Sequence, residues 1–358
     1  MRKIRILFPY VGKTLGGSHM ASLLLSQKIS KKKYETIIFV HKKGKLTEYL
    51  DKNRIKWITH KDSSIYFNGR LTQIFFLIFR YKKILKDLNV DIVHTHDLAM
   101  HLTWLLPCKL LNVYHIWHQR AKSGKKIILL ANLSSQIISI SRFIRNNFPE
   151  SLKKKTVTIY DPILFKKKNL AKKKSKKLKI CIVANLQRLK RIEIAIDIIL
   201  KIKKTFNQKV ILNIFGEKRE PIFSELKKLI INNKLESNIE FMGLKTPIKP
   251  WILKSDILLA TSENEGLGLS ILEAMSLGTP VVASNDGGHK ETIKNKKNGF
   301  LVELDDIDGY VDVIINLYNN TLLKNKIIRN AKKTVREKFS LNKHLDQIDK
   351  VYEKFIKN

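Results

Sequence analysis

Residues 256–284 read D-I-L-L-A-T-S-E-N-E-G-L-G-L-S-I-L-E-A-M-S-L-G-T-P-V-V-A-S, and the pattern of these residues is the most informative in the chain. The apolar run 256–260 predicts a buried parallel strand. A short helix is expected to begin near Ser270 and to end at Gly278 and Pro280, because proline cannot continue a helix. A further apolar run then starts the next strand. The stretch is therefore a βαβ unit with a glycine-bearing loop at the carboxyl end of a strand, where open α/β sheets bind ligands.

The loop in this stretch has the residues of a diphosphate site. Gly266 and Gly268 let the backbone approach a ligand closely, and the free N–H groups of the following helix favour an anion. Glu265 and Glu273 stand on either side of these glycines. A carboxylate beside a phosphate site accepts hydrogen bonds from hydroxyls, as the acidic residue of dinucleotide-binding folds does with ribose. The combination predicts a nucleotide sugar as ligand, and the alternative is an ordinary capped helix with a solvent-facing glutamate.

The same stretch resembles the donor-binding signature of the GT-B retaining glycosyltransferases of family four, E-G-F-G-L-x-x-x-E-A-M-A-x-G-x-P-V-V. Ser276 replaces the second alanine of that pattern, and a leucine replaces its phenylalanine. The resemblance implies that Glu265 contacts the transferred sugar, that Glu273 holds ribose hydroxyls, and that transfer retains the anomeric configuration. It also implies that the donor diphosphate binds to the backbone of Gly266, Leu267, Gly268 and Leu269.

The composition sets the class of protein. A chain of 358 residues is too long for one comfortable core, and its 44% hydrophobic content is typical of a globular protein with two domains. Its longest apolar run, 74–79, is far shorter than the roughly 18 residues that cross a bilayer. The N-terminus enters a strand pattern at Ile4 without the features of a signal peptide. With Cys108 and Cys181 far apart and no disulfide framework, we expect a cytoplasmic protein.

The formal charge of +38 has physical consequences but identifies no function by itself. A lysine-, isoleucine- and asparagine-rich composition is what AT-rich coding produces. Such a surface attracts anionic lipid headgroups, by about 1 kcal/mol per well-placed basic residue, and binds nucleic acid non-specifically at low salt. No specific nucleic acid is expected. In segment 66–88 we expect Ile74-Phe75-Phe76 to lie in the core, and peripheral contact of the basic flanks with an anionic membrane stays open.

Strand and helix patterns alternate in both halves, which indicates parallel sheets covered on both faces. The strands expected in the first half are 3–9, 34–41, 55–59, 91–95, 112–117, 136–140 and 156–160. Those expected in the second half are 178–184, 209–215, 238–242, 256–260, 280–284 and 300–302. The clearest helices are expected near 18–30, 70–88, 306–319, 322–338 and 342–357.

These patterns divide the chain. A Rossmann-like, acceptor-side domain over 1–165 is followed by a lysine-rich linker, 166–177. A second Rossmann-like domain over 178–339 is expected to bind the nucleotide sugar, and a helix over 340–358 ends the chain. The GT-B fold that the sequence resembles has two such α/β domains facing a central cleft, with the last helix crossing back to the N-terminal domain.

A second motif follows the first strand of the second half. The segment 183–191 is similar to the G-R-L-x-x-x-K segment of the family, whose basic residues hold the donor diphosphate. Lys190 matches the lysine, and we expect it to neutralise the departing diphosphate. Asn185 stands where the family usually has arginine, and either Arg188 or Arg191 can supply the second charge, since the spacing does not choose between them.

Two further motifs lie in the first half. Gly16 and Gly17, in the sequence L-G-G-S, resemble the Gly-Gly loop of the family, which implies close approach to the donor phosphate or sugar. The nearby Gly12-Lys13-Thr14 imitates the end of a nucleotide-binding P-loop but lacks its first glycine, because Leu7 takes that place. His118, at the end of a strand, matches the histidine that the family places near the donor sugar.

No metal and no cofactor are expected. His94 and His96 share one face of a strand, which suits a metal, but further ligands at metal spacing do not follow. Asp306 and Asp308 imitate the Asp-x-Asp of metal-dependent glycosyltransferases, yet Asp306 is expected to cap a helix instead. The segment 285–291 resembles the G-G-x-x-E element of the family, and its glycines are candidates for ligand approach.

The sequence thus predicts a retaining glycosyltransferase of the hexosyltransferase type that takes a nucleoside-diphosphate sugar as donor. Its expected acceptor is a saccharide or a lipid-linked saccharide of cell-envelope polysaccharide synthesis. Two alternatives stay open. One is a basic, non-catalytic Rossmann-like binding protein, and the other is a sugar-nucleotide epimerase of the same fold.

Overall fold

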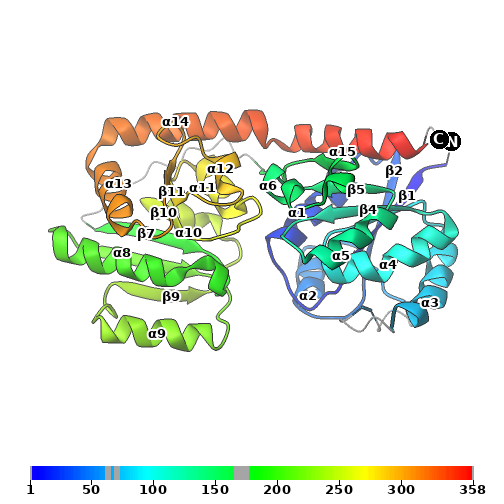
Figure 1. Ribbon diagram of the computed structural model, residues 1–358, viewed down its shortest axis with the longest axis horizontal. Coiled ribbons are helices and arrows are strands. Elements are labelled where there is room, and N and C mark those ends of the chain that lie inside the picture. The colour runs from blue at the N-terminus through cyan, green and yellow to red at the C-terminus, as the bar shows by residue number, and fades with distance from the viewer. Residues whose placement is uncertain (1, 61–65, 68–72, 165–176, 357–358) are drawn as a thin grey trace. The chain divides into compact units, whose positions relative to one another are not determined.

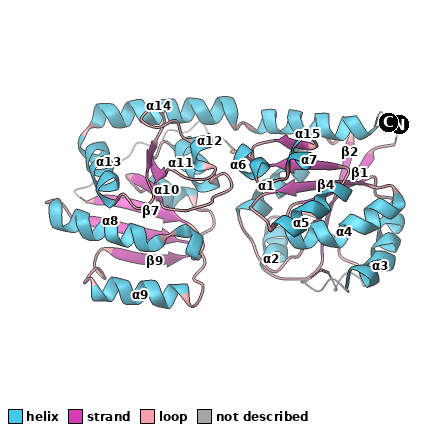
Figure 2. Ribbon diagram, viewed as in Figure 1, coloured by secondary structure: helices cyan, strands magenta, loops and turns pink. Residues whose placement is uncertain are grey.

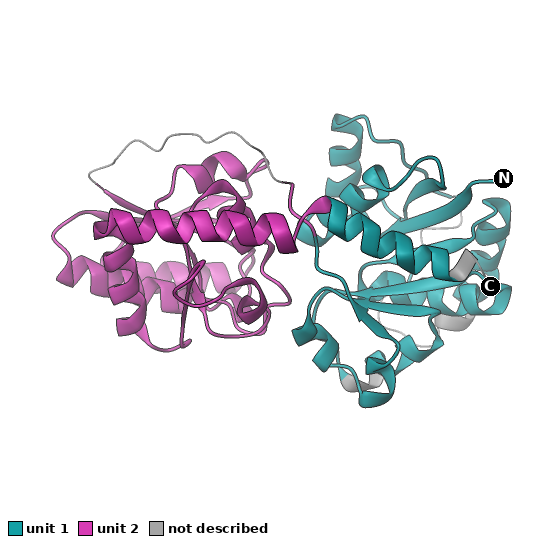
Figure 3. Cartoon of the chain, turned by 90° about the horizontal axis from the view of Figure 1, so that it is seen from above, with its two compact units in different colours: residues 1–161, 342–358 teal, residues 162–341 magenta. Residues whose placement is uncertain are grey.

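The computed structural model describes residues 2–60, 66–67, 73–164 and 177–356. The chain forms two compact units (Figure 3), one made of residues 1–161 with 342–358 and the other of residues 162–341. The predicted lysine-rich linker 166–177 lies outside the described residues except for Lys177.

The first unit is built on a parallel six-stranded sheet in the order β2-β1-β3-β4-β5-β6. Its central strands are almost wholly buried, as expected of strands covered by helices on both faces (Figure 2). The order changes direction between β1 and β3, which lie side by side although β2 separates them in sequence. The strands are β1 Ile4–Tyr10, β2 Tyr34–Val40, β3 Ile92–Thr95, β4 Tyr114–Gln119, β5 Gln136–Ser139 and β6 Thr156–Thr158.

The helices of the first unit include one that comes from the far end of the chain. The side chains of Ile348, Val351 and Tyr352 on α15 belong to the core of this unit. Polar contacts also fix that helix, because Lys33 Nζ lies 2.7 Å from the Asp349 carboxylate. The helices are α1 Gly17–Lys28, α2 Lys45–Lys52, α3 Gln73–Asp87, α4 Leu98–Leu111, α5 Lys125–Leu129, α6 Arg142–Asn146, α7 Glu150–Lys153 and α15 Leu341–Ile356 (Figure 1).

The second unit has a parallel six-stranded sheet in the order β12-β11-β10-β7-β8-β9. Counted from its own first strand, this is the order 3-2-1-4-5-6 of a dinucleotide-binding fold, and it changes direction between β7 and β10. The strands are β7 Leu178–Val183, β8 Val210–Phe215, β9 Ile239–Gly243, β10 Ile257–Ala260, β11 Val281–Ser284 and β12 Phe300–Val302. The helices are α8 Ile192–Thr205, α9 Ile222–Asn232, α10 Lys249–Leu253, α11 Leu269–Leu277, α12 His289–Thr292, α13 Ile307–Asn319 and α14 Thr321–Lys338.

Two parallel α/β sheets confirm the predicted fold class, but two local expectations are wrong. The segment 55–59 is not a strand, because Ile58 makes a single bridge to Phe39 at the edge of the sheet and is partly exposed. Phe76 is not a core residue, since it and Phe79 on α3 are 82% and 80% exposed. The side chains of Ile74 and Phe75 lie outside the described part of that helix.

In the described part of the chain, every helix is too short or too polar to cross a membrane.

Candidate active site

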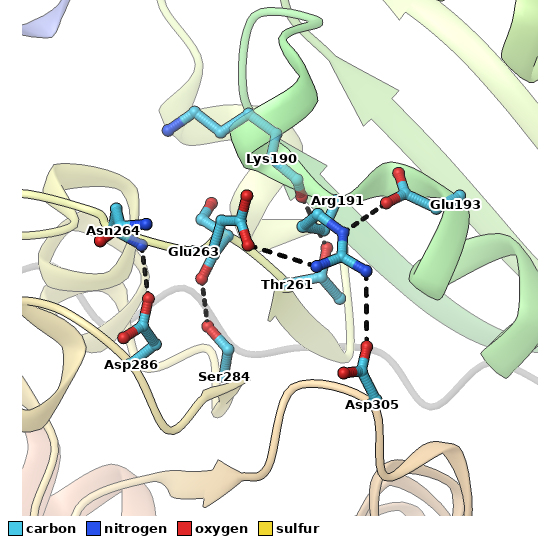
Figure 4. Close-up of polar contacts among 10 residues, drawn as sticks. Lys190, Arg191, Glu193, Thr261, Glu263, Asn264, Ser284, Asp286 and Asp305 are labelled. Carbon is cyan, nitrogen blue, oxygen red and sulfur yellow. Dashed lines mark hydrogen bonds and ion pairs between the residues drawn. The ribbon is translucent and has the colours of Figure 1, made fainter.

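The predicted donor residues of the second unit lie where its strand order reverses. Lys190 ends a short 3-10 turn, Arg188–Lys190, in the loop after β7, and Glu265 lies in the loop after β10. These two loops are tied together, since Thr261 Oγ1 donates to the Lys190 carbonyl at 2.9 Å (Figure 4). The Glu263 N–H donates to the carbonyl of Leu189 at 2.8 Å. The two strand ends at the reversal therefore present one connected surface.

Lys190 and Glu265 form an ion pair, although 75 residues separate them. Their side chains are 21% and 24% exposed, so the pair is half-buried but open to a ligand. Burial alone would raise the pKa of the Glu265 carboxyl, but the charge and the hydrogen bond of Lys190 hold that pKa below its ordinary value. Glu265 is therefore ionised at neutral pH, and a cation and a carboxylate stand side by side.

The other basic residues of the turn have different partners. Arg191 donates to Glu193 at 2.5 Å and also contacts Glu263 and Asp305, at 3.3 Å and 3.4 Å (Figure 4). The positive charge of Arg191 is thus balanced by these three carboxylates. Arg188, the residue expected to assist at the diphosphate, is mostly exposed and pairs with Glu225 on α9 at 2.9 Å. The structure thus brings Lys190, and not Arg188, to Glu265.

Asn185, which replaces the expected arginine, has a structural contact. Its Oδ1 accepts a hydrogen bond from the Glu217 N–H at 2.8 Å, which joins the loop after β7 to the loop after β8. At the same place Gly216 lies so close to the backbone that an added Cβ would be 1.9 Å from the Ala184 carbonyl oxygen. Asn185 therefore fixes two neighbouring strand ends.

The glycine loop leads directly into α11. Gly266, Leu267 and Gly268 are buried, and Gly268 has a φ of 82°, which favours glycine. Leu269 is the first residue of the helix, one position earlier than Ser270. The N–H groups of this first turn face the end of the loop, as an anion-binding helix start requires.

Glu273 lies on α11 with its carboxylate unpaired. Among the residues that the structure describes, no side chain or backbone group forms a hydrogen bond or an ion pair with it. It is half-buried, and burial raises the pKa of its carboxyl above the ordinary value. A carboxylate held partly out of water without a partner is costly for the fold and suits hydroxyl groups of a ligand.

The segment 285–291 supports the glycine loop from behind. An added Cβ at Gly287 would be 2.6 Å from the Glu265 carbonyl oxygen, and one at Gly288 would be 2.2 Å from that of Gly266. The Gly288 N–H donates to the Glu265 carbonyl at 2.7 Å. These two glycines therefore approach the protein backbone, where the sequence pattern had suggested approach to a ligand.

His289 is a site residue that the sequence pattern did not indicate. It is buried at the start of α12, and its Nδ1 lies 3.1 Å from Ser284 Oγ. Burial lowers its pKa, so the ring is neutral at pH 7, although the nearby charge of Glu265 acts in the other direction. The available signal was its position directly after Gly287 and Gly288, in the first turn of a helix.

The predicted glycines of the first unit lie after β1, at the reversal of that sheet. The Gly16 N–H donates to His19 Nδ1 at 3.1 Å, and Gly17 begins α1. An added Cβ at Gly16 would meet nothing closer than that His19 nitrogen, at 3.8 Å, so packing does not require glycine there. Gly12 differs, because an added Cβ would lie 1.9 Å from the Lys42 carbonyl oxygen and its φ is 100°. The fold therefore requires glycine at position 12, without any role in ligand binding.

His118 lies in β4 and is fully buried. Its Nδ1 is 3.1 Å from His94 Nε2, and its Nε2 has no hydrogen-bond partner among the described residues. Burial lowers the pKa of His118 well below the ordinary value, and the positive charge of Arg120 lowers it further. The ring is therefore neutral, and its Nε2 is a buried polar atom without a partner among the described residues.

His94, His96 and His118 are close enough to hold a metal ion, since one ligand nitrogen of each lies within 4.8 Å of the others. The surroundings disfavour a cation, because the Arg120 guanidinium is 3.3 Å from His96 Nδ1. The absence of a metal remains a prediction. The interpretation of Asp306 as a helix cap is confirmed, because its side chain accepts from the Gly309 N–H at 2.9 Å.

Family models match both units of the chain. The model described as Glycosyltransferase Family 4 matches residues 15–163, and the model described as Glycosyl transferases group 1 matches residues 165–334.

Curated relatives extend this similarity over most of the chain. The N-acetyl-alpha-D-glucosaminyl L-malate synthase of Bacillus anthracis is 27% identical over 288 residues, which cover 74% of each chain. The UDP-Gal:alpha-D-GlcNAc-diphosphoundecaprenol alpha-1,3-galactosyltransferase of Escherichia coli is 24% identical over 99% of this chain and 98% of that protein. Among solved structures, Anabaena HepE in complex with UDP and glucose superposes with a TM-score of 0.83. That likeness, at 18% identity, covers 98% of this chain and all of the other and shows the GT-B fold.

Proposed function

The chain belongs to glycosyltransferase family 4, and we propose that it moves a sugar from a nucleoside-diphosphate sugar to a saccharide or lipid-linked saccharide, with retention. The observation that carries this proposal is the half-buried pair of Lys190 and Glu265 at the strand reversal of the second unit. A cation for a diphosphate and a carboxylate for a sugar are adjacent there, beside the glycine loop.

The proposed chemistry follows from these groups. Negative charge builds on the diphosphate as its bond to the anomeric carbon breaks, and Lys190 with the first N–H groups of α11 stabilises that charge. Glu273 holds ribose hydroxyls, and Glu265 contacts the sugar. His118 and the backbone of Gly16 and Gly17 are assigned to contacts with the donor.

Retention is proposed to occur by displacement on one face of the sugar. The new bond from the acceptor oxygen forms on the face from which the diphosphate leaves, and the acceptor proton passes to a departing phosphate oxygen. Glu265 is a poor candidate for a covalent nucleophile, because its ion pair with Lys190 lowers its basicity. No cofactor beyond the donor substrate takes part in this scheme.

Names of the relatives support the choice of substrates. The Escherichia coli relative is named for UDP-galactose and a diphosphoundecaprenol-linked acceptor, and the HepE structure contains UDP and glucose. We therefore propose a UDP-hexose as donor and a step of cell-envelope polysaccharide synthesis as the reaction.

Binding of the donor can be tested through Glu273. A panel of UDP, GDP, dTDP and CMP sugars should contain one that raises the thermal stability, since a ligand at a hundredfold excess over Kd stabilises by about 2.7 kcal/mol. In Glu273→Gln we expect that affinity to fall by roughly 10- to 100-fold, because a hydrogen bond to a charged group is lost. The unliganded melting temperature should stay the same or rise, since an unpaired half-buried charge has been removed.

Glu236→Gln, an exposed carboxylate of the same unit, is the control and should bind the donor normally. Equal affinity of Glu273→Gln and wild type would remove Glu273 from the site. Product analysis with and without an acceptor separates transfer from epimerisation, because an epimerase changes the donor sugar without an acceptor.

A membrane surface is a further proposed partner, on the evidence of helix α3. Phe76, Phe79, Lys83 and Lys86 lie on one face of this helix and are exposed. Aromatic side chains beside lysines on one helix face are typical of a helix that lies on an anionic membrane.

Vesicle binding tests this surface. Replacing Phe76 and Phe79 together with serine should weaken binding to phosphatidylglycerol-containing vesicles by about tenfold or more, because apolar area leaves the lipid interface. Leu322→Ser on α14, whose side chain is 84% exposed in the other unit, is the matched control and should bind as wild type does. Equal sedimentation of both variants with the vesicles would exclude α3 as the contact.

A further inference from the structure

His19 caps the start of α1 with one of its two ring nitrogens. The Gly16 N–H donates to His19 Nδ1 at 3.1 Å, so Nδ1 is the acceptor of a capping box. Burial lowers the pKa of His19 to about 4, and the positive charge of Arg120 acts in the same direction. The ring is therefore neutral at pH 7. Because Nδ1 accepts from a backbone N–H, the single ring proton is on Nε2.

The proton on His19 Nε2 has no acceptor in the described part of the protein. No hydrogen bond or ion pair joins this nitrogen to a residue that the structure describes, and the atom is not enclosed by protein. The side chain is half-buried, and its ring lies 6.0 Å from that of Tyr10, measured between centroids. An N–H group that is partly withdrawn from water, unpaired and accessible suits an oxygen of a ligand.

The helix α2 of the same unit has the same kind of cap, but there the cap is complete. Thr47 stands three residues into that cap, and its Oγ1 accepts from the Gly44 N–H at 3.0 Å. The Thr47 hydroxyl donates its own proton back to the Gly44 carbonyl, at 2.8 Å. The side chain that caps α2 is thus satisfied within the protein, whereas the one that caps α1 keeps a free N–H. Capping therefore explains the Nδ1 of His19 but not its Nε2.

This free N–H belongs to the part of the first unit where a ligand is expected. The loop before α1 follows β1, where the strand order reverses between β1 and β3, and open α/β sheets bind ligands at that place. The Gly16 N–H of this loop is already bound to His19. The loop therefore presents the N–H of the His19 ring to a ligand in place of the N–H of Gly16.

We propose that His19 binds the sugar donor, with its Nε2–H donating a hydrogen bond to an oxygen of the diphosphate or of the sugar. The Gly16 N–H polarises the ring through Nδ1, which strengthens the hydrogen bond that Nε2 donates. The nitrogen that faces the substrate carries the proton, so His19 does not act there as a general base. This inference rests on the proposed function for its ligand.

Two substitutions separate the roles of the two ring nitrogens. In His19→Asn the amide oxygen takes the place of Nδ1 and keeps the cap, while the donor at Nε2 is lost. We expect its affinity for the sugar nucleotide that most stabilises the wild type to fall about tenfold, at an unchanged melting temperature. In His19→Gln an amide N–H reaches the place of Nε2, and most of that affinity should return. Isothermal titration measures these affinities.

Thr47→Val is the matched control, because it removes the corresponding cap of α2. It should lower the melting temperature and leave the affinity for the sugar nucleotide unchanged. Titration with the parent nucleotide then identifies the oxygen. A loss of affinity for the nucleotide as well assigns His19 to the diphosphate, and a loss confined to the sugar nucleotide assigns it to the sugar. Wild-type affinity in His19→Asn, or an equal loss in Thr47→Val, overturns the proposal.

Nuclear magnetic resonance of the full chain, with ¹⁵N-labelled histidine, reads the position of the ring proton, because protonated and unprotonated ring nitrogens resonate far apart. We expect His19 to be protonated on Nε2, and a proton on Nδ1 contradicts the proposal. If no nucleotide sugar binds the wild type, the proposed function fails and the contact with His19 fails with it, although the measured tautomer still stands. If the wild type binds the donor and His19→Asn binds it equally well, the role of His19 alone is wrong.

Discussion

Lys190→Met is expected to lower kcat by about 10²- to 10³-fold, the cost of removing one preorganised group that stabilises developing negative charge. Methionine keeps the length and the apolar stem of the side chain but not its charge. The described basic residues of the same turn cannot replace it, because Arg191 is bound to three carboxylates and Arg188 pairs with Glu225. Affinity for UDP should fall as well. Steady-state transfer kinetics and UDP titration measure both effects.

The pH dependence of the activity of Lys190→Met is a second test of the ion pair between Lys190 and Glu265. Without the lysine charge, burial dominates, and the pKa of Glu265 should rise above its ordinary value. If ionised Glu265 is needed, activity is then lost at a higher pH than in the wild type as the solution is acidified. Lys201→Met is the control, since Lys201 pairs with Asp308 in the same unit at an exposed position. A kcat close to that of the wild type would remove Lys190 from the diphosphate site.

Glu265→Gln should lower transfer by a comparable amount, on the order of 10²- to 10³-fold, but with the opposite effect on nucleotide affinity. Glutamine keeps the shape of the side chain and loses the negative charge that we propose faces the sugar, where positive charge develops in glycosyl transfer. Lys190 is released from its ion pair by this change, so UDP affinity should be unchanged or higher.

Together, the two variants measure how strongly the contributions of Lys190 and Glu265 to catalysis depend on each other. Asp308→Asn is the matched carboxylate control, and Lys201→Met with Asp308→Asn forms a parallel double-mutant cycle at an exposed ion pair, which is worth little. Coupling in catalysis should be large for Lys190 with Glu265 and small for the control pair. If Glu265→Gln and Lys190→Met both weakened UDP binding alike, the division of roles would be wrong.

Much of the architecture could be predicted from the chain because strand and helix patterns are local. The pattern predicts the last strand at 300–302, where β12 lies, and the three final helices that it predicts agree with α13, α14 and α15 within two residues. The donor motif could also be placed at a strand end, since a glycine-bearing loop after an apolar run has few alternatives. The two errors concern apolar residues that are not buried, Ile58 beside the edge of the sheet and Phe76 on the surface of α3.

Pairings between distant residues could not be predicted in this way. Lys190 and Glu265 were each expected in the site, but a local pattern cannot show that they form an ion pair. Nor can it show that Gly287 and Gly288 fit the backbone of the neighbouring loop, since a glycine required by packing and one required by a ligand look alike in sequence. The partner of His94 lies on the last helix, so its role depends on the completed fold.

The position of α15 at the end of the sequence sets the order in which the two units can complete their folding during synthesis. Its core side chains Ile348, Val351 and Tyr352 leave the ribosome after the whole of the second unit, which can finish folding while the first still lacks part of its core. A chain interrupted between the two events would carry a complete second unit and an unfinished first one. In such a chain His94 would lack the Tyr352 hydroxyl, and the buried hydrogen bonds that run from α15 to His118 would be incomplete.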